Sequence, residues 1–349
     1  MLKAFDEKDS KGRRKKEDAN GNANLFAVDC ERIVESKAYR RLSEKTQAFS
    51  LPEHPHIRTR STHTDEVWAI SRKISRALGI NTELAEAIAR GHDIGHAPFG
   101  HLGERMLTEL GSTPATANQF KHAAYGVVLA QEIENRGRGM NLCYETLEGI
   151  LYHARGSGEL KLSAKKPAEY GVVMLADKIA YTFGDYSDSN RCDHFPVEKY
   201  AKLMEKINTH LGSETKERRD ACVAALIKES RSKGAVSFSE GKEYELFKEL
   251  REVLYSDVYK RIKVDMHKTA IKELYDFLAS NHEFKHRYNS FSPVIFISLL
   301  TDREVTYFGQ LLFSSKNIKL KDIEHFGAFE LLPELKDKKV DYSNPGLEW

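Results

Sequence analysis

The sequence predicts an all-α protein, and three observations support this prediction. From Leu25 onward, apolar residues recur every three or four positions, which places them on one face of a helix. Strand signals are few, and only the stretch 291–300 (FSPVIFISLL) is ambiguous between strand and helix. The 349 residues, 40% hydrophobic and 30% charged, have the ordinary composition of a soluble globular protein with a sizeable core.

The helices can be placed by their caps and interruptions. One is expected to open at Thr62-His-Thr-Asp65, which resembles a capping box, and to end at Gly79. A second begins near Thr82, and the stretch 95–100 (GHAPFG) then favours a loop because Pro and Gly interrupt helices. Another helix begins near His101. Further helices are expected at 144–152, 170–185, 197–211, 216–230, 243–255 and 264–280.

The two ends of the chain differ from its middle. Residues 1–24 are rich in Asp, Asn, Gly and Lys, and we expect a disordered, solvated basic tail. Its cluster 11–16 (KGRRKK) is the one part suited to touch phosphates. The polar stretch after about Lys316 is the least readable, so 314–349 is treated as a C-terminal extension of unknown structure.

Composition excludes several classes of protein. The net charge of +2 argues against a dedicated nucleic-acid binder, which usually has a strong basic excess. The sequence contains no run of about 18 apolar residues, so no membrane span is expected, and the N-terminus lacks the apolar core of a signal peptide. The cysteines form no CxxC pair, so we expect reduced thiols in a cytoplasmic protein: Cys30, Cys143, Cys192 and Cys222.

Polar residues interrupt apolar helix faces that we expect to be buried. His63 precedes Val67 by four residues, His92 continues an apolar row, and Asp177 lies within an apolar run. Asp93 follows His92 directly. A buried carboxylate is costly unless it is paired or binds a metal. Two imidazoles and two carboxylates suit a divalent ion such as Mn, Mg, Fe, Co or Ni.

Each of these residues has an ordinary interpretation when taken alone. A single His on an apolar face is more often a satisfied core residue, and a His-Asp pair occurs by chance in many proteins. A buried Asp can cap a helix or pair with an Arg. The combination, together with the unusual stretch 91–101 (GHDIGHAPFGH), favours a metal site.

The pattern His63, His92-Asp93 and Asp177 resembles the HD superfamily of metal-dependent phosphohydrolases. More narrowly, the chain is similar to the deoxynucleoside triphosphate triphosphohydrolases, the group of bacterial dGTPases and the mammalian SAM-and-HD-domain dNTPase. The matching segments are 29–42, 45–49, 58–63, 92–104 and 177–181, with weaker similarity at 250–259 and 300–303. The resemblance therefore spans roughly 29–313 in order, and 25–313 is expected to form the HD-type domain.

The resemblance implies both a reaction and a metal site. His63, His92, Asp93 and Asp177 would hold the catalytic metal beside the α-phosphate. Water attacks that phosphorus, the 5′-oxygen leaves, and the products are a deoxynucleoside and tripolyphosphate. The resemblance also implies a homo-oligomer, commonly a tetramer or hexamer, and it leaves open an allosteric nucleotide and weak binding of single-stranded nucleic acid.

Catalytic residues are suggested next to the metal ligands. The resemblance points to His101 as the catalytic His, and Glu104, three residues on, can accept its other ring proton. His122 matches a further active-site His. The alternative for His101 and Glu104 is an exposed helix N-terminus, and for His122 the two interpretations are equally open. His96 is expected near the site, with its role undecided.

The resemblance also suggests contacts to the substrate. Arg60 and Lys178 would reach phosphate oxygens. Tyr181 and Asp185 follow Asp177 at i+4 and i+8 and would contact the deoxyribose, with the Tyr excluding a 2′-hydroxyl. The alternative is that Tyr181 is simply a core residue.

Gln47 matches a position against the sugar or base. The sequence departs from the family after His122, where a polar Asn-x-Gln signature is replaced by Ala123-Ala124-Tyr125. The base preference of the site stays undetermined.

Two other functions remain as alternatives. An HD-type site could act on a nucleoside monophosphate or a (p)ppGpp-like nucleotide, and the products would separate this activity from release of tripolyphosphate. A nucleic-acid-binding regulatory protein with a vestigial site would show salt-dependent binding without turnover.

Overall fold

The computed structural model describes residues 2–17, 24–50, 54–112, 119–154, 165–262, 264–289, 291–314 and 317–348. Over these ranges the chain is helical, and its only β contacts are two isolated bridges, Arg13 with Cys143 and Thr46 with Thr59. The predicted all-α class is confirmed. None of the described helices is both long and apolar enough to cross a membrane, and the four cysteines are free thiols.

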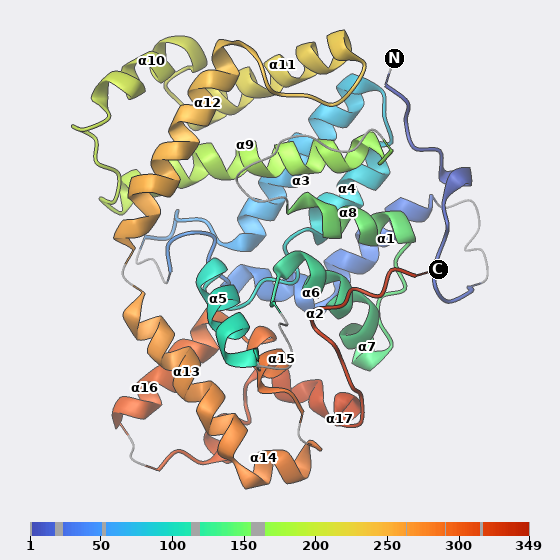
Figure 1. Cartoon of the computed structure of the whole chain (residues 1–349), viewed down its shortest axis with the longest axis vertical. Helices are drawn as coiled ribbons and strands as arrows, with labels where there is room; N and C mark the ends of the chain where they lie inside the picture. The colour runs from blue at the N-terminus through green and yellow to red at the C-terminus, as the bar shows by residue number, and fades with distance from the viewer. Residues whose placement is uncertain are drawn as a thin grey trace.

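One half of the molecule packs around the central helix α9 (Ala168–Arg191), which crosses the upper part of Figure 1. Its side chains share one buried apolar cluster with those of the helices around it. These helices are α1 (Leu25–Glu35), α3 (Arg60–Leu78), α4 (Thr82–Gly91), α10 (Ala201–Leu211), α11 (Thr215–Lys233) and α12 (Gly241–Val253).

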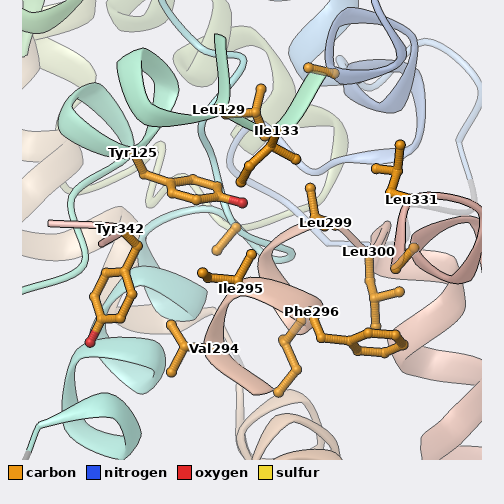
Figure 2. Packing of buried hydrophobic residues seen from close by; sticks show 14 of the residues in the cluster. Tyr125, Leu129, Ile133, Val294, Ile295, Phe296, Leu299, Leu300, Leu331 and Tyr342 are labelled. Atoms are coloured by element: carbon orange, nitrogen blue, oxygen red, sulfur yellow. The ribbon is translucent and has the colours of Figure 1, made fainter. Parts of the chain in front are cut away.

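The other half, most of which lies in the lower part of Figure 1, has its own apolar cluster. Its helices are α2 (Lys37–Arg41), α5 (His101–Gly111), α6 (His122–Val128), α7 (Glu134–Gly137), α8 (Tyr144–His153), α13 (Asp265–Ser280), α14 (His282–Arg287), α15 (Pro293–Ser298), α16 (Asp302–Ser314) and α17 (Leu332–Leu335). Figure 2 shows Tyr125 of α6 lying against α15, where the Ser298 hydroxyl donates to the Tyr125 oxygen at 2.7 Å.

The described part of the C-terminal extension belongs to this second cluster. Leu331 and Tyr342 lie in the core shown in Figure 2, and Phe326 and Leu335 are also buried. The extension therefore supplies apolar surface to the same core as the helices before it.

One local prediction differs from the structure, and one ambiguous stretch proves to be helical. Helix α3 begins at Arg60, two residues before the expected start, because Thr59 rather than Thr62 is the N-cap. Thr59 and Thr62 form the capping box, and Gly79 ends the helix with φ of 68°, as predicted. The ambiguous stretch 291–300 contains helix α15, which starts at Pro293. Its β-branched residues are buried, and tertiary packing overrides their strand preference.

The N-terminal segment also differs from the expected solvated tail over its described residues, 2–17. The Arg13 guanidinium donates to the Asp29 carboxylate, to Asn141 O at 2.6 Å and to Leu25 O at 3.0 Å. Asp29 is fully buried, so Arg13 supplies the cation that its carboxylate needs. A pair between an exposed-looking Arg and a buried Asp has no local sequence signature.

A short loop between α4 and α5 joins the two halves. Asp302 of α16 accepts hydrogen bonds from Phe99 N at 2.7 Å and from Thr46 N at 2.8 Å. Gly95 lies against the backbone of α6, and a Cβ at this position would be 2.2 Å from His122 O and 2.3 Å from Gly126 N. Only glycine permits this approach.

We predict that Gly95→Ala lowers the free energy of unfolding by about 1–3 kcal/mol, because backbone atoms must move to admit the methyl group. Urea denaturation measures the change. Gly327→Ala is the matched control, since its Cβ would lie 3.6 Å from the Glu304 carboxylate, which is an ordinary van der Waals distance. Equal stability of the two variants would contradict the close approach of the loop to α6.

Candidate active site

The four predicted metal ligands meet between α3, α4 and α9. His63 Nε2 lies 3.0 Å from Asp177 Oδ1, and His92 Nε2 lies 4.0 Å from the same oxygen. Asp93 Oδ1 is 3.5 Å from His92 Nε2. One ligand atom from each of His63, His92 and Asp93 falls within 4.8 Å of the others. The structure therefore brings together two imidazoles and two carboxylates from distant parts of the chain.

His92 is oriented as a metal-binding imidazole. Its Nδ1 lies 2.7 Å from Ala89 O, so Nδ1 carries the proton and Nε2 carries the lone pair. Nε2 is buried and finds no hydrogen-bond partner within the described ranges. An unsatisfied buried acceptor costs about 1–3 kcal/mol. A divalent cation would satisfy it, and the donor set fits such an ion.

The charges around the ligands favour their metal-binding forms. Burial opposes ionisation of Asp93, but neighbouring groups, among them the Arg60 guanidinium, hold the pKa of Asp93 well below its usual value. Arg60 Nη1 donates to Asp93 Oδ2 at 2.7 Å. Burial opposes ionisation of Asp177 too, yet His63 lowers its pKa. Burial lowers the pKa of His92, which keeps the ring neutral.

A second group of side chains lies beside the first. Glu104 binds two imidazoles, with Oε2 at 2.6 Å from His101 Nδ1 and Oε1 at 2.6 Å from His122 Nδ1. Burial opposes ionisation of Glu104, but His122 and His101 hold its pKa well below normal. The same pairing raises the pKa of His122 against the effect of burial. His101 does stand at an exposed helix N-terminus, yet it is paired with Glu104.

His96 connects the two groups. Its Nε2 lies 3.3 Å from Asp93 Oδ1, and its ring stacks on that of His122 with centroids 3.8 Å apart. Burial lowers the pKa of His96 well below its usual value. The loop residue that sequence reasoning left without a role is therefore packed between the carboxylate of one group and the imidazole of the other.

His153 is a site residue that sequence reasoning missed. It ends α8, its Nε2 lies 3.2 Å from His122 Nε2, and its ring packs edge-on against His92 with centroids 5.1 Å apart. A lone His at the end of an ordinary helix carries no spacing or neighbouring residue that singles it out. Only the tertiary fold reveals its position.

The predicted sugar-binding Asp185 is held firmly in place. Arg58 pairs with it at 2.5 Å, and the Tyr259 hydroxyl donates to its other oxygen at 2.6 Å. The same guanidinium binds Asp188 at 2.9 Å and Glu66 at 3.0 Å. Burial raises the pKa of Asp185 despite the cation. Neither Arg58 nor Tyr259 was predicted as its partner, because both are distant in sequence.

The remaining predicted substrate residues surround this helix face. Tyr181 is half-buried and packs edge-on against Tyr255, with centroids 6.4 Å apart, so it is not enclosed in the core. Lys178 is buried, and burial lowers its pKa. The backbone oxygen of Gln47 lies 3.4 Å from Arg60 Nη2. The side-chain oxygen of Gln47 is buried without a hydrogen-bond partner in the described part of the chain.

Comparison with known proteins agrees with this geometry. Residues 60–182 match the HD domain family. A deoxyguanosinetriphosphate triphosphohydrolase-like protein of Caldanaerobacter subterraneus is 40% identical over 252 residues, covering 72% of this chain and 70% of its own. Proteins of the same name from Clostridium tetani, 38% identical over 72% and 71%, and Desulfatibacillum aliphaticivorans, 35% identical over 78% of each chain, are also similar.

The helical fold, the HD match and the grouped His and Asp side chains define an HD-domain hydrolase. Within that class, the relatives show that the chain belongs to the family of deoxyguanosinetriphosphate triphosphohydrolase-like proteins. The resemblance stated from the sequence is confirmed.

We predict that Arg58→Ala lowers the free energy of unfolding by about 3–5 kcal/mol, because Asp185 and Asp188 lose a buried cation. Chemical denaturation measures the loss. Arg303→Ala is the control, since Arg303 is 81% exposed and pairs only loosely with Glu44 at 3.7 Å. Its stability should change by less than about 1 kcal/mol. A similar loss in both variants would contradict the structural role of Arg58.

Proposed function

We propose that this protein hydrolyses deoxynucleoside triphosphates, dGTP or several dNTPs, to a deoxynucleoside and tripolyphosphate. The observation that carries the proposal is the convergence of His63, His92, Asp93 and Asp177 beside the Glu104 group. The names of the relatives support a nucleoside triphosphate as substrate. The proposal includes a cytoplasmic location and a homo-oligomer, and it leaves open whether an allosteric nucleotide binds.

The proposed metal ligands are His63, His92, Asp93 and Asp177. When bound, a divalent ion supplies charge neutralisation at the phosphate and lowers the pKa of water. The nitrogen and oxygen donors are compatible with Mn, Mg, Fe, Co or Ni.

Arg60 and Lys178 are proposed to bind the phosphate chain. Arg60 already donates to Asp93 through Nη1, and its Nε is a buried donor without a partner among the described residues. This N–H is therefore suited to a phosphate oxygen close to the metal ligands. Lys178 follows Asp177 directly, and its ammonium is proposed to neutralise another phosphate oxygen.

His101 is proposed to protonate the departing 5′-oxygen. The Nδ1–H of His101 donates to Glu104, which fixes the ring, and the doubly protonated ring would donate its Nε2–H to the leaving oxygen. Because His101 is 65% exposed, it can regain its proton from solvent. His122, on the other oxygen of Glu104, is proposed to act on the phosphate side of the site.

The α9 residues are proposed to select a deoxyribose. Tyr181 would lie under the sugar and exclude a 2′-hydroxyl. Asp185 keeps acceptor capacity for a 3′-hydroxyl, because a carboxylate offers about four lone-pair sites and Arg58 and Tyr259 use only some. Gln47 offers its unsatisfied side-chain oxygen to the sugar or base.

The proposal is tested by incubating the full chain with each of the four dNTPs and Mn²⁺ and identifying the products. We expect a deoxynucleoside and intact tripolyphosphate. The variant with both His92→Ala and Asp93→Ala should bind no metal at this site and show no turnover. Full activity of that variant would reject the metal site, whereas hydrolysis only of a nucleoside monophosphate or a (p)ppGpp-like nucleotide would reject the substrate. Salt-dependent binding of single-stranded nucleic acid without turnover would favour the regulatory alternative.

We predict that His101→Ala retains metal and nucleotide binding but lowers kcat by about two to four orders of magnitude, because the leaving group loses its proton donor. Single-turnover kinetics, with binding measured separately, test this effect. The exposed His210 of α10 supplies the control, and His210→Ala should leave kcat unchanged. An unchanged kcat in His101→Ala would transfer the acid role to His122 or His96.

A further inference from the structure

Residues 2–17 form an N-terminal arm that runs along one side of the molecule (Figure 1). The ring of Phe5 packs edge-on against Phe26 of α1, with ring centroids 6.0 Å apart. The Glu7 carboxylate accepts a hydrogen bond from Leu25 N, the first amide of α1, at 2.7 Å. The arm is therefore docked on the first turn of α1 through both an apolar and a polar contact.

The same arm joins the starts of α4 and α9. Glu169, in the first turn of α9, is fully buried, and its Oε1 accepts hydrogen bonds from Phe5 N at 3.1 Å and from Asn81 N at 2.8 Å. Asn81 is the N-cap of α4, and its Nδ2 donates to Phe5 O at 3.0 Å. These three residues form a closed set of hydrogen bonds between the arm and two helices that are distant in sequence.

A second set of contacts holds the start of α8. Glu145, in the first turn of α8, is 4% exposed. Its Oε2 accepts from the Ser10 hydroxyl at 2.5 Å, and its Oε1 accepts from Lys11 N at 2.9 Å. Tyr144 N donates to Gly12 O at 2.9 Å. Because a buried carboxylate needs donors, the arm supplies what this end of α8 requires.

The helices α4, α8 and α9 lead from the arm to the candidate active site. His92 directly follows α4, His153 ends α8, and Asp177 lies eight residues after Glu169 in α9. At 1.5 Å per residue, these side chains are roughly 12–16 Å along their helices from the contacts with the arm. Their ends meet, because His92 packs on the ring of His153 and lies 4.0 Å from Asp177. Rigid helices transmit a shift at one end to the other.

We propose that the N-terminal arm is a positioning element of the active site. It fixes the starts of α4, α8 and α9 together, so that His92, His153 and Asp177 meet at the correct distances further along these helices. Ligand groups must be held within about 0.5 Å of their working geometry, which requires the helices that carry them to be fixed as well. The inference deepens the proposed function and rests on it for the role of the metal ligands.

The experiment loosens the arm in the full chain with Glu145→Ala. Glu145→Gln is the matched control, because Gln can accept from Lys11 N and donate from Nε2 to the Ser10 hydroxyl oxygen. Amide hydrogen exchange is measured on metal-free protein at two site segments, 89–94 and 150–153, and the Mn²⁺ Kd is measured by titration calorimetry. We expect Glu145→Ala to raise both the exchange rates and the Kd by about tenfold, and Glu145→Gln to match the wild type.

Ile323→Ala separates positioning from a general loss of stability. Ile323 is fully buried in the other apolar cluster, so its truncation destabilises the protein without touching the arm. The Kd of the folded protein is unaffected as long as the folded state predominates. We therefore expect Ile323→Ala to keep the wild-type Mn²⁺ Kd and to show no selective rise of exchange at the two site segments.

Two results in Glu145→Ala would overturn the positioning role: faster exchange confined to the arm and the first turn of α8, or an unchanged Mn²⁺ Kd. If this variant fails to fold, Phe5→Ala takes its place, since it loosens the arm and leaves α4, α8 and α9 unaltered. Hydrolysis of dNTPs is measured on the same samples. A wild type that binds no Mn²⁺ and hydrolyses no dNTP rejects the proposed function, and exchange at the two site segments then decides the positioning role.

Discussion

The burial of Asp93 as an ionised carboxylate is the constraint on which this site depends. An uncompensated buried charge costs several kcal/mol, and Asp93 is 3% exposed. Arg60 donates to it at 2.7 Å, and the pKa of Asp93 stays well below its usual value although burial opposes its ionisation. Arg60 comes from α3 and Asp93 from the loop after α4, so this charge can be stabilised only when the two elements meet. A metal ion would complete the same compensation, which explains why an orphaned His92 nitrogen lies beside this carboxylate.

The loop that carries Asp93 and His96 is fixed from the opposite side by buried ionisable groups. Lys45 Nζ donates to His96 O at 2.5 Å and to Ser298 O at 2.9 Å, and burial lowers the pKa of Lys45 to about 7. Asp302 binds the amide of Phe99. The lower half of the molecule therefore holds the backbone on which the upper half assembles its ligands. A site built this way is rigid, because moving the loop would leave several buried polar groups unsatisfied.

The site could be predicted from the sequence where its residues lie close together in one segment. The adjacent His92 and Asp93 and the i,i+3 spacing of His101 and Glu104 can be read within one segment, and the structure has both pairs in contact. The helices follow from apolar periodicity for the same reason. The roles of His153 and Arg58 could not be predicted. His153 contacts His122 and Arg58 pairs with Asp185 and Asp188, and in both cases the partners are distant in sequence and no local pattern marks the residue. These contacts join different helices, and the sequence determines them only through the fold.

Glu104 binds two imidazoles that differ in their exposure to solvent. His101 and His122 bind its two oxygens at the same distance, 2.6 Å, but their side chains are 65% and 11% exposed. A general acid must be protonated again after each turnover, which requires access to solvent or a relay. The carboxylate therefore fixes the orientation of both rings. The ring of His101 is open to solvent, whereas the ring of His122 is buried and faces His153.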